Sequence, residues 1–411
     1  MRRLLVLVPF SPRCDGTHGG SRAIAELLTV LSARHRVAVI YLRGSDEPPM
    51  DEALSARCDV VREIPHIHPP GVRRLARWLR VVLAAFAGRP FWVGWWRVPE
   101  YATCVREMAA SWRPDVVQLE FHLMGQYIEA LGECAAPRVL VEHDPGVKTG
   151  QPTRRARRAI GLGRHALRWL DDSAWRRYES RIMRQVQAVI VFTDRDRATL
   201  MPLSGGTPIV RIPLGAVIPD VPSNAIGTDP ATLLFVGSFR HLPNIDAAER
   251  LVTTIVPEVV KARPDVKLVL AGSDVPAALR QQAGPQVEFA GFVSDLGPYL
   301  DRASLVTVPL RLGGGMRVKV LEAMAAGKAI VATRLAVEGL EVHDGHEVAI
   351  ADSDEEFSRQ IVDLLADAGK RARLGANARV WAAEHLRWPR IADAYEQLYN
   401  GLLLEAAAAS D

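Results

Sequence analysis

Short apolar runs alternate with amphipathic segments along most of the chain. Residues 4–10 read LLVLVPF, and residues 21–33 then place apolar side chains at helical spacing. Further apolar runs, with helical segments between them, follow at residues 37–42, 60–64, 116–119, 139–141 and 189–192. Continuous apolar strands separated by helices are typical of a parallel sheet covered on both faces. The first half of the chain is therefore predicted to form a doubly wound α/β domain.

The same pattern begins again after residues 203–230, which are rich in Pro, Gly, Ser and Asn and indicate a domain boundary. Strands are predicted at residues 233–236, 266–271, 287–289, 305–308 and 329–332, and helices at 247–261, 354–365, 370–384 and 389–404. We expect an α/β protein with two Rossmann-like, doubly wound parallel-sheet domains, residues 1–205 and 206–388. Ligands of open α/β sheets bind outside the carboxyl ends of the strands, so both domains are expected to face a central cleft.

Composition and charge narrow the class of protein. Of 411 residues, 48% are hydrophobic and 24% are charged, which is typical of globular proteins. The net charge of +4 is small for this length and does not indicate nucleic-acid binding. The four cysteines are widely spaced, without a C-x-x-C pair or a nearby histidine cluster. We therefore expect free thiols in a reducing compartment and no zinc site.

The apolar runs also bear on location. The first residues, MRRLLVLVPF, predict a buried strand rather than a signal peptide, because the run is short and lacks a small-residue cleavage site. No apolar run approaches the roughly 20 residues that span a bilayer. We expect a cytoplasmic protein, or one peripheral on the inner face of the plasma membrane.

A glycine-rich loop in the second half carries candidate chemistry. Residues 311–333 read RLGGGMRVKVLEAMAAGKAIVAT, so three glycines leave a predicted strand and run directly into a helix. Glycines let the backbone approach an oxyanion, and a helix N-terminus offers unpaired N–H groups with partial positive charge. Arg317 and Lys319 add formal charge at the same place. The loop predicts a phosphate or diphosphate site; the alternative is a flexible connector with solvated cations.

Other residues at strand ends extend this site. Glu322 lies among apolar residues of the same helix and suits a ribose diol, since two adjacent hydroxyls can donate to one carboxylate. The alternative for Glu322 is an exposed helix glutamate. Three further strands end in Gly237-Ser238-Phe239-Arg240, Gly272 and Phe292-Val293. Arg240 is placed to reach the same anion, and Phe292 with Val293 to contact a flat base. Together these residues predict a nucleotide-diphosphate site.

Five stretches of the second half resemble one large enzyme family. They are LLFVGSFRHLPNIDA, VKLVLAGS, VEFAGFVSDL, LVTVPLRLGGGMRVKVLEAMAAGKAIVAT and VEGLEVHDGHEVAIADSDEEF. In order and spacing they resemble the retaining GT-B glycosyltransferases of family GT4, also called glycosyltransferase group 1. The resemblance implies a GT-B fold with an acceptor-binding first domain and a second domain that binds an NDP-sugar, UDP- or GDP-linked. It also implies that residues 389–411 form a C-terminal helix crossing back to the first domain.

The resemblance assigns roles residue by residue. In the second domain, Glu322 would bind the ribose and Arg240 a phosphate. The residues implied to line the donor site are Gly237, Ser238, Gly272, Phe292, Val293, Gly314, Gly315, Met316 and Arg317, and Lys319 is implied in catalysis. One departure stands out, because the first glutamate of the family's E-x7-E pair would fall at Gly314 and is absent. We interpret this absence as a subgroup feature.

The first domain matches the family more weakly. Gly19-Gly20 resembles the glycine-rich loop that faces the donor phosphate and the acceptor. In the strand that ends DVVQLEFH, relatives often carry a histidine where this chain has Glu120, and His122 lies just beyond. Both residues are therefore candidates for catalysis, and His143-Asp144 resembles another pair that faces the cleft. Each of these residues has a structural role as its alternative.

The function implied is that of a retaining hexosyltransferase that moves a sugar from an NDP-sugar to a hydroxyl of a glycan, lipid-linked or natural-product acceptor. Such enzymes generally need no metal, no metal-ligand cluster is evident in the sequence, and no cofactor is expected. Two alternatives remain open. One is a sugar-nucleotide epimerase or phosphorylase on the same fold, and the other is a sugar-nucleotide-binding pseudoenzyme.

Two basic stretches raise the question of a membrane. Residues 73–101 combine five arginines before Phe91 with Trp78, Trp92, Trp95 and Trp96, and residues 154–168 hold six arginines and no acidic residue. Arginines beside aromatic side chains are typical of segments that lie on an anionic membrane. The alternatives are packing into the first domain's core and lining an acceptor cleft. We expect peripheral contact with an anionic membrane.

Overall fold

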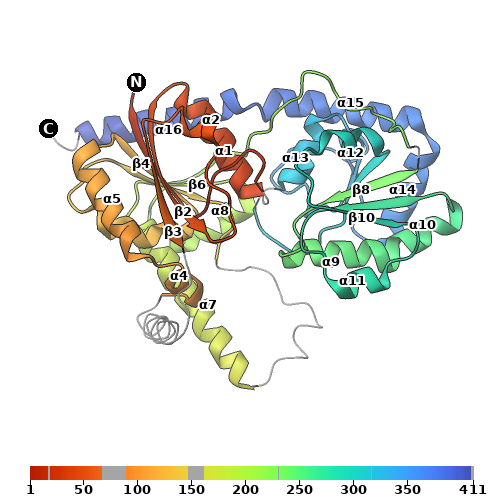
Figure 1. Ribbon diagram of the computed structural model, residues 1–411, viewed down its shortest axis with the longest axis horizontal. Coiled ribbons are helices and arrows are strands. Elements are labelled where there is room, and N and C mark those ends of the chain that lie inside the picture. The colour runs from red at the N-terminus through yellow and green to blue at the C-terminus, as the bar shows by residue number, and fades with distance from the viewer. Residues whose placement is uncertain (17–18, 67–88, 147–161, 230, 316, 409–411) are drawn as a thin grey trace. The chain divides into compact units, whose positions relative to one another are not determined.

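The chain folds into two compact units, seen in a computed structural model that describes residues 1–16, 19–66, 89–146, 162–229, 231–315 and 317–408 (Figure 1). Unit 1 comprises Met1–Cys14, Ile24–Ile212 and Ala392–Asp411. Unit 2 comprises Asp15–Ala23 and Pro213–Ile391. Each unit is built on its own parallel sheet, so the predicted α/β class with two Rossmann-like domains is confirmed.

Unit 1 is organised around a parallel sheet in the order β3-β2-β1-β4-β5-β6-β7 within the described residues. Its strands are β1 (Arg3–Val8), β2 (Arg36–Gly44), β3 (Val60–His66), β4 (Val116–Glu120), β5 (Arg138–Glu142), β6 (Ala188–Val191) and β7 (Ile209–Arg211). The first six occur where apolar runs predict them. The sequence pattern does not predict β7, because three residues are too few to show a period and they lie in a stretch rich in Pro and Gly.

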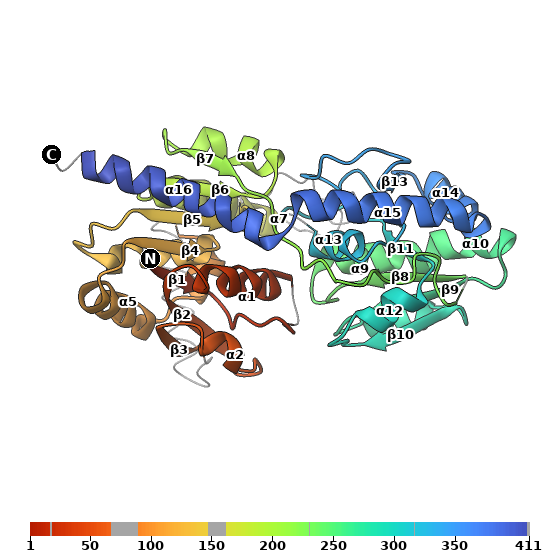
Figure 2. The same cartoon turned by 90° about the horizontal axis from the view of Figure 1, so that it is seen from above.

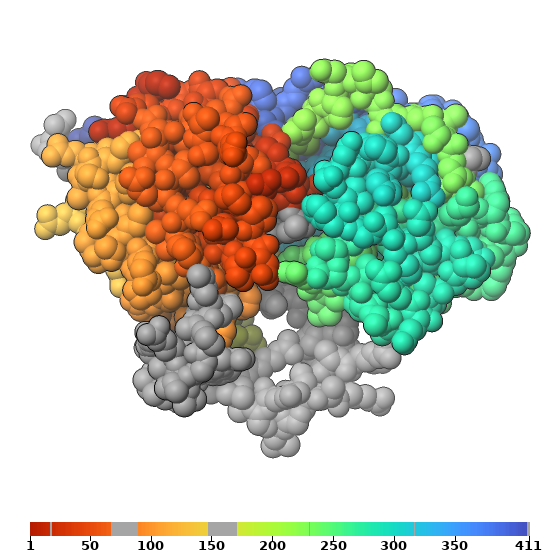
Figure 3. All heavy atoms as spheres, viewed as in Figure 1, coloured from red at the N-terminus to blue at the C-terminus, as the bar shows by residue number. Residues whose placement is uncertain are grey.

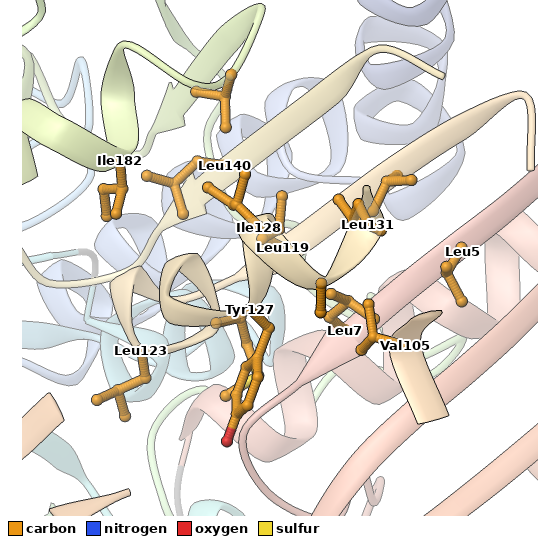
Figure 4. Close-up of a cluster of buried hydrophobic side chains, with 14 of the residues drawn as sticks. Leu5, Leu7, Val105, Leu119, Leu123, Tyr127, Ile128, Leu131, Leu140 and Ile182 are labelled. Carbon is orange, nitrogen blue, oxygen red and sulfur yellow. The ribbon is translucent and has the colours of Figure 1, made fainter. Parts of the chain in front are cut away.

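Helices cover both faces of this sheet, as Figure 2 shows from above. They are α1 (Gly19–Ser32), α2 (Glu52–Ser55), α4 (Phe91–Trp95), α5 (Pro99–Trp112), α7 (Leu162–Met183), α8 (Asp194–Leu200), the end of α16 (Trp388–Ala408), and the 3₁₀ segments η1 (His122–Leu131) and η2 (Met201–Leu203). One face of the sheet packs on α5, η1 and α7 through a buried cluster that includes Leu7, Val105, Leu119, Tyr127 and Ile182 (Figure 4). Burial of such side chains is the main force that holds the layers together.

Unit 2 repeats the arrangement with the sheet order β10-β9-β8-β11-β12-β13 among its described strands. They are β8 (Thr232–Val236), β9 (Lys267–Ala271), β10 (Val287–Gly291), β11 (Leu305–Val308), β12 (Ile330–Ala332) and β13 (Ala349–Ile350). The helices are α9 (Leu242–Arg250), the π-helical turn η3 (Leu251–Ile255), α10 (Val256–Ala262), α11 (Ala277–Gln282), α12 (Gly297–Arg302), α13 (Val318–Ala325), α14 (Asp354–Ala366) and α15 (Ala368–His385). In the space-filling view, the green-to-cyan part of unit 2 forms a continuous surface (Figure 3).

All strand pairs within each sheet are parallel, so every strand of a sheet ends at the same edge. At that edge of unit 2 lie the loops after β8, β9, β10 and β11, which carry the glycines predicted to bind an anion. None of the described helices combines the length and apolar character that crossing a bilayer requires.

A buried arginine joins the ends of three elements of unit 2. The side chain of Arg250 is 3% exposed, and its guanidinium donates to the carbonyls of Pro309 at 3.1 Å and Asp352 at 2.8 Å, and to the carboxylate of Asp354. These contacts tie α9 to the segment after β11 and to the start of α14. The loop that leads into α13 is thereby anchored just before its glycines.

Replacing Arg250 is expected to destabilise unit 2. Arg250→Met fills much of the same space but leaves two buried carbonyls and a carboxylate without their donor, which costs about 3 kcal/mol of unfolding free energy. Hydrogen exchange measured in rising urea will resolve unit 2 from unit 1. Arg263→Met removes an exposed pair with Asp265 and serves as the control, with a much smaller loss, because solvent screens exposed ion pairs. Equal losses for the two variants would show that the Arg250 contacts carry no special weight.

Candidate functional site

Backbone hydrogen bonds join the loops after β8, β9 and β10. Gly237 N donates to Ala271 O at 2.9 Å, and Gly272 N donates to Gly291 O at 2.7 Å. Gly272 has φ of +151°, and a Cβ built on it would lie 1.9 Å from Gly237 O, so no side chain fits there. Glycine at this position permits two loops to touch backbone to backbone. The result is a fixed floor at the carboxyl edge of the sheet.

Lys319 stands on this floor. It lies in the first turn of α13, and its Nζ donates to Asn244 Oδ1 at 2.6 Å and lies 4.3 Å from the centre of the Phe235 ring. A Cβ built on Gly237 would lie 2.8 Å from the same nitrogen. Burial, followed by the charge of Arg317, lowers the pKa of Lys319 to about 7, and Glu322 opposes the shift. An anion placed beside this ammonium group would restore its charge.

The glycine loop wraps around the cation that follows it. Gly313 and Gly315 have φ of +113° and +66°, a region that favours glycine. The guanidinium of Arg317 donates to the carbonyls of Gly314 and Gly315 and therefore folds back onto the loop. The predicted site residue Met316 lies outside the described residues. The loop, Arg317 and Lys319 together surround the N-terminus of α13 with donors.

Glu322 is paired rather than exposed. Its two oxygens lie 2.8 Å and 3.4 Å from the guanidinium nitrogens of Arg22, which belongs to the same unit. Burial raises the pKa of Glu322, while Arg22 and Lys319 pull it down. A carboxylate offers about four acceptor positions, so Arg22 leaves some of them for other donors. The role of Glu322 in ribose binding stays a prediction, but the alternative of a solvated surface glutamate does not fit these contacts.

The segment around Gly19 differs from its predicted conformation. The predicted helix starts at Ser21, but α1 begins at Gly19, so Gly19 and Gly20 form its first turn rather than a loop. A Cβ on Gly19 would lie 2.9 Å from Val318 Cγ2, at the start of α13 and in the same unit. Glycine at this position lets the first residues of α1, which belong to unit 2, approach α13 closely, and Arg22 of the same segment reaches Glu322.

The remaining donor-site candidates lie further out along the same edge. Arg240 is largely exposed and pairs with Asp274 at 2.9 Å; the hydroxyl of Ser273, followed by Arg240, holds the pKa of that carboxyl below its usual value. Ser238 accepts a hydrogen bond from Asn244 through its backbone carbonyl. Phe292 is 51% exposed, which is unusual for an aromatic side chain and leaves its face open to a ligand.

In unit 1, the predicted residue Glu120 is buried in a chain of hydrogen bonds. Glu120 is the last residue of β4 and is 1% exposed. One of its oxygens lies 2.6 Å from His143 Nε2, and the other accepts from the amide of Gln118. The His143 ring stacks on Phe121 with centroids 3.9 Å apart. Glu120 therefore holds the His143 ring through a hydrogen bond. His143, which directly follows β5, is a candidate for contact with a ligand.

His122 belongs to a second buried cluster. Its Nδ1 lies 2.9 Å from Glu142 Oε1, and its backbone carbonyl accepts from the hydroxyl of Tyr178 at 2.8 Å. Burial alone would lower the pKa of His122, but the carboxylate of Glu142, with smaller contributions from Glu179 and Asp144, raises it above its ordinary value. The neighbouring carboxylates thus favour the charged form of this imidazole.

The fold brings together a group that the sequence does not reveal. Ligand atoms of His122, Glu142 and Glu179 lie within 4.8 Å of one another, although the three residues are far apart in the chain. Such a set resembles metal ligands, whereas no metal-ligand cluster is evident in the sequence. In the structure the group is held by hydrogen bonds, since Gly146 N donates to Glu179 Oε1 at 2.6 Å and His122 bonds Glu142.

Comparison with protein families finds a match within the second unit. The family model described as "Glycosyl transferases group 1" matches residues 230–367. An uncharacterized 44.6 kDa protein in the cps region of Klebsiella pneumoniae is 24% identical over 36% of this chain and 40% of its own length. A GDP-mannose-dependent monoacylated alpha-(1-6)-phosphatidylinositol monomannoside mannosyltransferase of Corynebacterium glutamicum is 30% identical over 32% of this chain and 38% of its own. The chain thus matches less than half the length of these relatives.

Solved structures resemble the whole chain. Sucrose-phosphate synthase of Thermosynechococcus elongatus superposes with a TM-score of 0.73 at 19% identity, covering 98% of this chain and 100% of that one. HepE of Anabaena, in complex with UDP and glucose, gives 0.66 at 14% identity over the same shares. These likenesses confirm the GT-B fold. With the family match at residues 230–367, they confirm the predicted resemblance to the group 1 glycosyl transferases.

Proposed function

We propose that this protein is a retaining hexosyltransferase that moves a sugar from an NDP-sugar to a hydroxyl of a glycan, lipid-linked or natural-product acceptor. The observation that carries the proposal is the position of Lys319. This lysine has a lowered pKa and lies at the N-terminus of α13, against the hydrogen-bonded loops after β8 and β9. A nucleoside diphosphate supplies the negative charge that balances the cations Arg317 and Lys319. The neighbour in complex with UDP and the relative named for GDP-mannose support a nucleotide donor.

In the proposed reaction, the bond from the anomeric carbon to the diphosphate oxygen breaks, and the acceptor oxygen forms its bond on the same face of the sugar. The acceptor proton passes to an oxygen of the leaving diphosphate. Lys319, Arg317 and the N–H groups of the glycine loop stabilise the charge that develops on that group, which is the largest catalytic term expected of such a site. No residue is required to replace the carboxylate missing at Gly314 in this step.

The first experiment measures release of NDP from UDP- and GDP-sugars with and without candidate acceptors. Release that depends on an acceptor, with an anomeric configuration kept in the product, supports the proposal. Glu322→Gln is expected to weaken donor binding more than tenfold, because the ribose hydroxyls lose a charged acceptor worth about 1.5–3 kcal/mol. Glu258→Gln, at an exposed pair on α10, is the matched control.

The outcomes separate the alternatives. A nucleotide sugar that binds without turnover for any acceptor would favour the pseudoenzyme, and isomerised sugar or phosphorolysis would favour an epimerase or phosphorylase. We propose that no metal or other cofactor takes part, so turnover should survive EDTA. Loss of turnover in EDTA, restored by a divalent ion, would instead direct attention to His122, Glu142 and Glu179.

Affinity for nucleoside diphosphate is expected to depend on the protonation of Lys319. Because the pKa of Lys319 is about 7 and an anion favours its charged form, binding is strongest below pH 7 and weakens as pH rises above it. Calorimetry between pH 6 and 8.5 measures this directly, with proton uptake at pH 7.5. The nucleotide's own phosphate titrates in the same range, so the informative quantity is the difference between wild type and Lys319→Met. Lys267→Met, an exposed lysine of β9, should keep the wild-type profile; a Lys319→Met profile identical to wild type would contradict the assignment.

We also propose that unit 1 contacts an anionic membrane. Most of residues 73–101 and 154–168 lie outside the described residues, but the neighbouring surface is described. Arg176, Arg177, Arg181 and Arg184 line a hollow of about 510 Å³ along α7, and no carboxylate of the described residues forms an ion pair with them. Burial and the charges of Arg97 and Arg181 lower the pKa of Arg89, and Trp92 is 53% exposed. Arginines along α7, and an exposed tryptophan on α4, whose Phe91 N donates to Asp171 of α7, suit a membrane surface.

Co-sedimentation with vesicles tests this contact. The chain should bind vesicles rich in phosphatidylglycerol, and not phosphatidylcholine alone, with release at high salt. The triple variant Arg176→Gln, Arg177→Gln, Arg184→Gln should reduce binding more than tenfold, since each cation near the surface contributes about 1 kcal/mol. The control removes the same charge from unit 2 through Lys261→Gln, Lys267→Gln and Arg373→Gln. Equal binding of vesicles by both triple variants would show that the α7 surface is not the membrane contact.

A further inference from the structure

A chain of buried hydrogen bonds runs from the terminal helix to the carboxyl edge of unit 1. The hydroxyl of Tyr399, in α16, donates to Gln118 Oε1. Gln118 Nε2 donates to Glu120 Oε1, and Glu120 Oε2 lies 2.6 Å from His143 Nε2. Tyr399 is fully buried, Gln118 and Glu120 are each 1% exposed, and His143 is 8% exposed. Every group in the chain therefore depends on its protein partners for hydrogen bonds.

The direction of each bond is determined by chemistry. The Tyr399 hydroxyl can donate only to the amide oxygen of Gln118, and this contact turns the amide nitrogen of Gln118 toward Glu120. A carboxylate that accepts from Gln118 on one oxygen offers the other to His143. The neutral imidazole of His143 then carries its proton on Nε2, which leaves Nδ1 as the basic nitrogen. A hydroxyl in the last helix thus selects the tautomer of a histidine at the end of β5.

The backbone beside this chain is strained. Phe121, between Glu120 and His122, has φ of +67° and ψ of 148°, a conformation that costs a non-glycine residue free energy. Its ring stacks on the His143 imidazole, with planes 9° apart. The ring of Phe192 contacts the same imidazole edge-on at 4.9 Å. The imidazole is therefore fixed in its plane by two aromatic rings and in its tautomer by Glu120.

We infer that Tyr399, Gln118 and Glu120 are positioning residues that set the tautomer and orientation of His143 for contact with the substrate. The expected effect on kcat rests on the proposed glycosyl transfer, whereas the expected effect on the tautomer of His143 does not. Docking of α16 completes the chain, so the terminal helix contributes to the site without touching the substrate.

The experiment compares Tyr399→Phe with Tyr395→Phe. Tyr395 lies one turn earlier in α16 and is 2% exposed, and the hydrogen bonds of the described residues include none from Tyr395 to Gln118 or Glu120. Long-range ¹H–¹⁵N spectra of ¹⁵N-histidine-labelled chain, with His143 assigned through His143→Gln, report the tautomer. Wild type and Tyr395→Phe should show neutral His143 protonated on Nε2, and Tyr399→Phe should show a mixture of both tautomers.

The kinetic arm should agree. Tyr399→Phe is expected to lower kcat about tenfold, since misplacement of one reacting group commonly costs this much or more, while the donor KM stays within about twofold. Gln118→Leu breaks the chain at its centre and replaces Tyr399→Phe if that variant does not fold. A wild-type tautomer in Tyr399→Phe, or a kcat equal to that of Tyr395→Phe, overturns the inference. Absence of transfer in the wild type would count against the proposed function alone, because the spectra remain informative.

Discussion

The contact of two backbones at Gly237 and Gly272 is the constraint on which the candidate donor site depends. A Cβ at Gly272 would lie 1.9 Å from Gly237 O, so the loops after β8 and β9 meet only because a side chain is absent. Their closeness fixes Gly237 beneath Lys319, and Asn244 holds the ammonium group in place. The floor of the site is thus made of backbone, which holds its shape when a ligand arrives and needs little reorganisation.

At both candidate sites, buried charged side chains are paired with side chains that can carry the opposite charge. In unit 2, Arg22 pairs with Glu322, and burial, followed by the charge of Arg317, lowers the pKa of Lys319. In unit 1, the two histidines are each matched with a buried glutamate on the neighbouring strand. Buried charge is costly unless it is paired, so such clusters persist where the fold gains specificity or function from them. The unit 2 cluster has an excess of cations and the unit 1 clusters are rich in carboxylates, which suits a diphosphate on the first and hydroxyl chemistry on the second.

Local features of the sequence predict much of the fold, but they do not predict side-chain contacts between residues that are far apart in the chain. Apolar runs mark the long strands, and glycines at strand ends mark the donor loops, because both signals are contained in a few consecutive residues. β7 and β13 are missed because two or three residues show no period. The bond from His143 to Glu120 joins neighbouring strands, and Arg22 reaches Glu322 across 300 positions, so no spacing rule announces either. For the same reason Glu120 and His122 look like equivalent catalytic candidates in the sequence, although one orients His143 and the other pairs with Glu142.

The central claim is that a nucleoside diphosphate binds at the carboxyl edge of the unit 2 sheet, against the N-terminus of α13. A crystal structure of the chain soaked with UDP or GDP tests it most directly. We predict that the diphosphate lies within hydrogen-bond distance of Lys319 Nζ and of backbone N–H groups between Gly313 and Arg317, with the ribose hydroxyls on Glu322. A nucleotide bound elsewhere on the chain, with Lys319 still held by Asn244 alone, would contradict it.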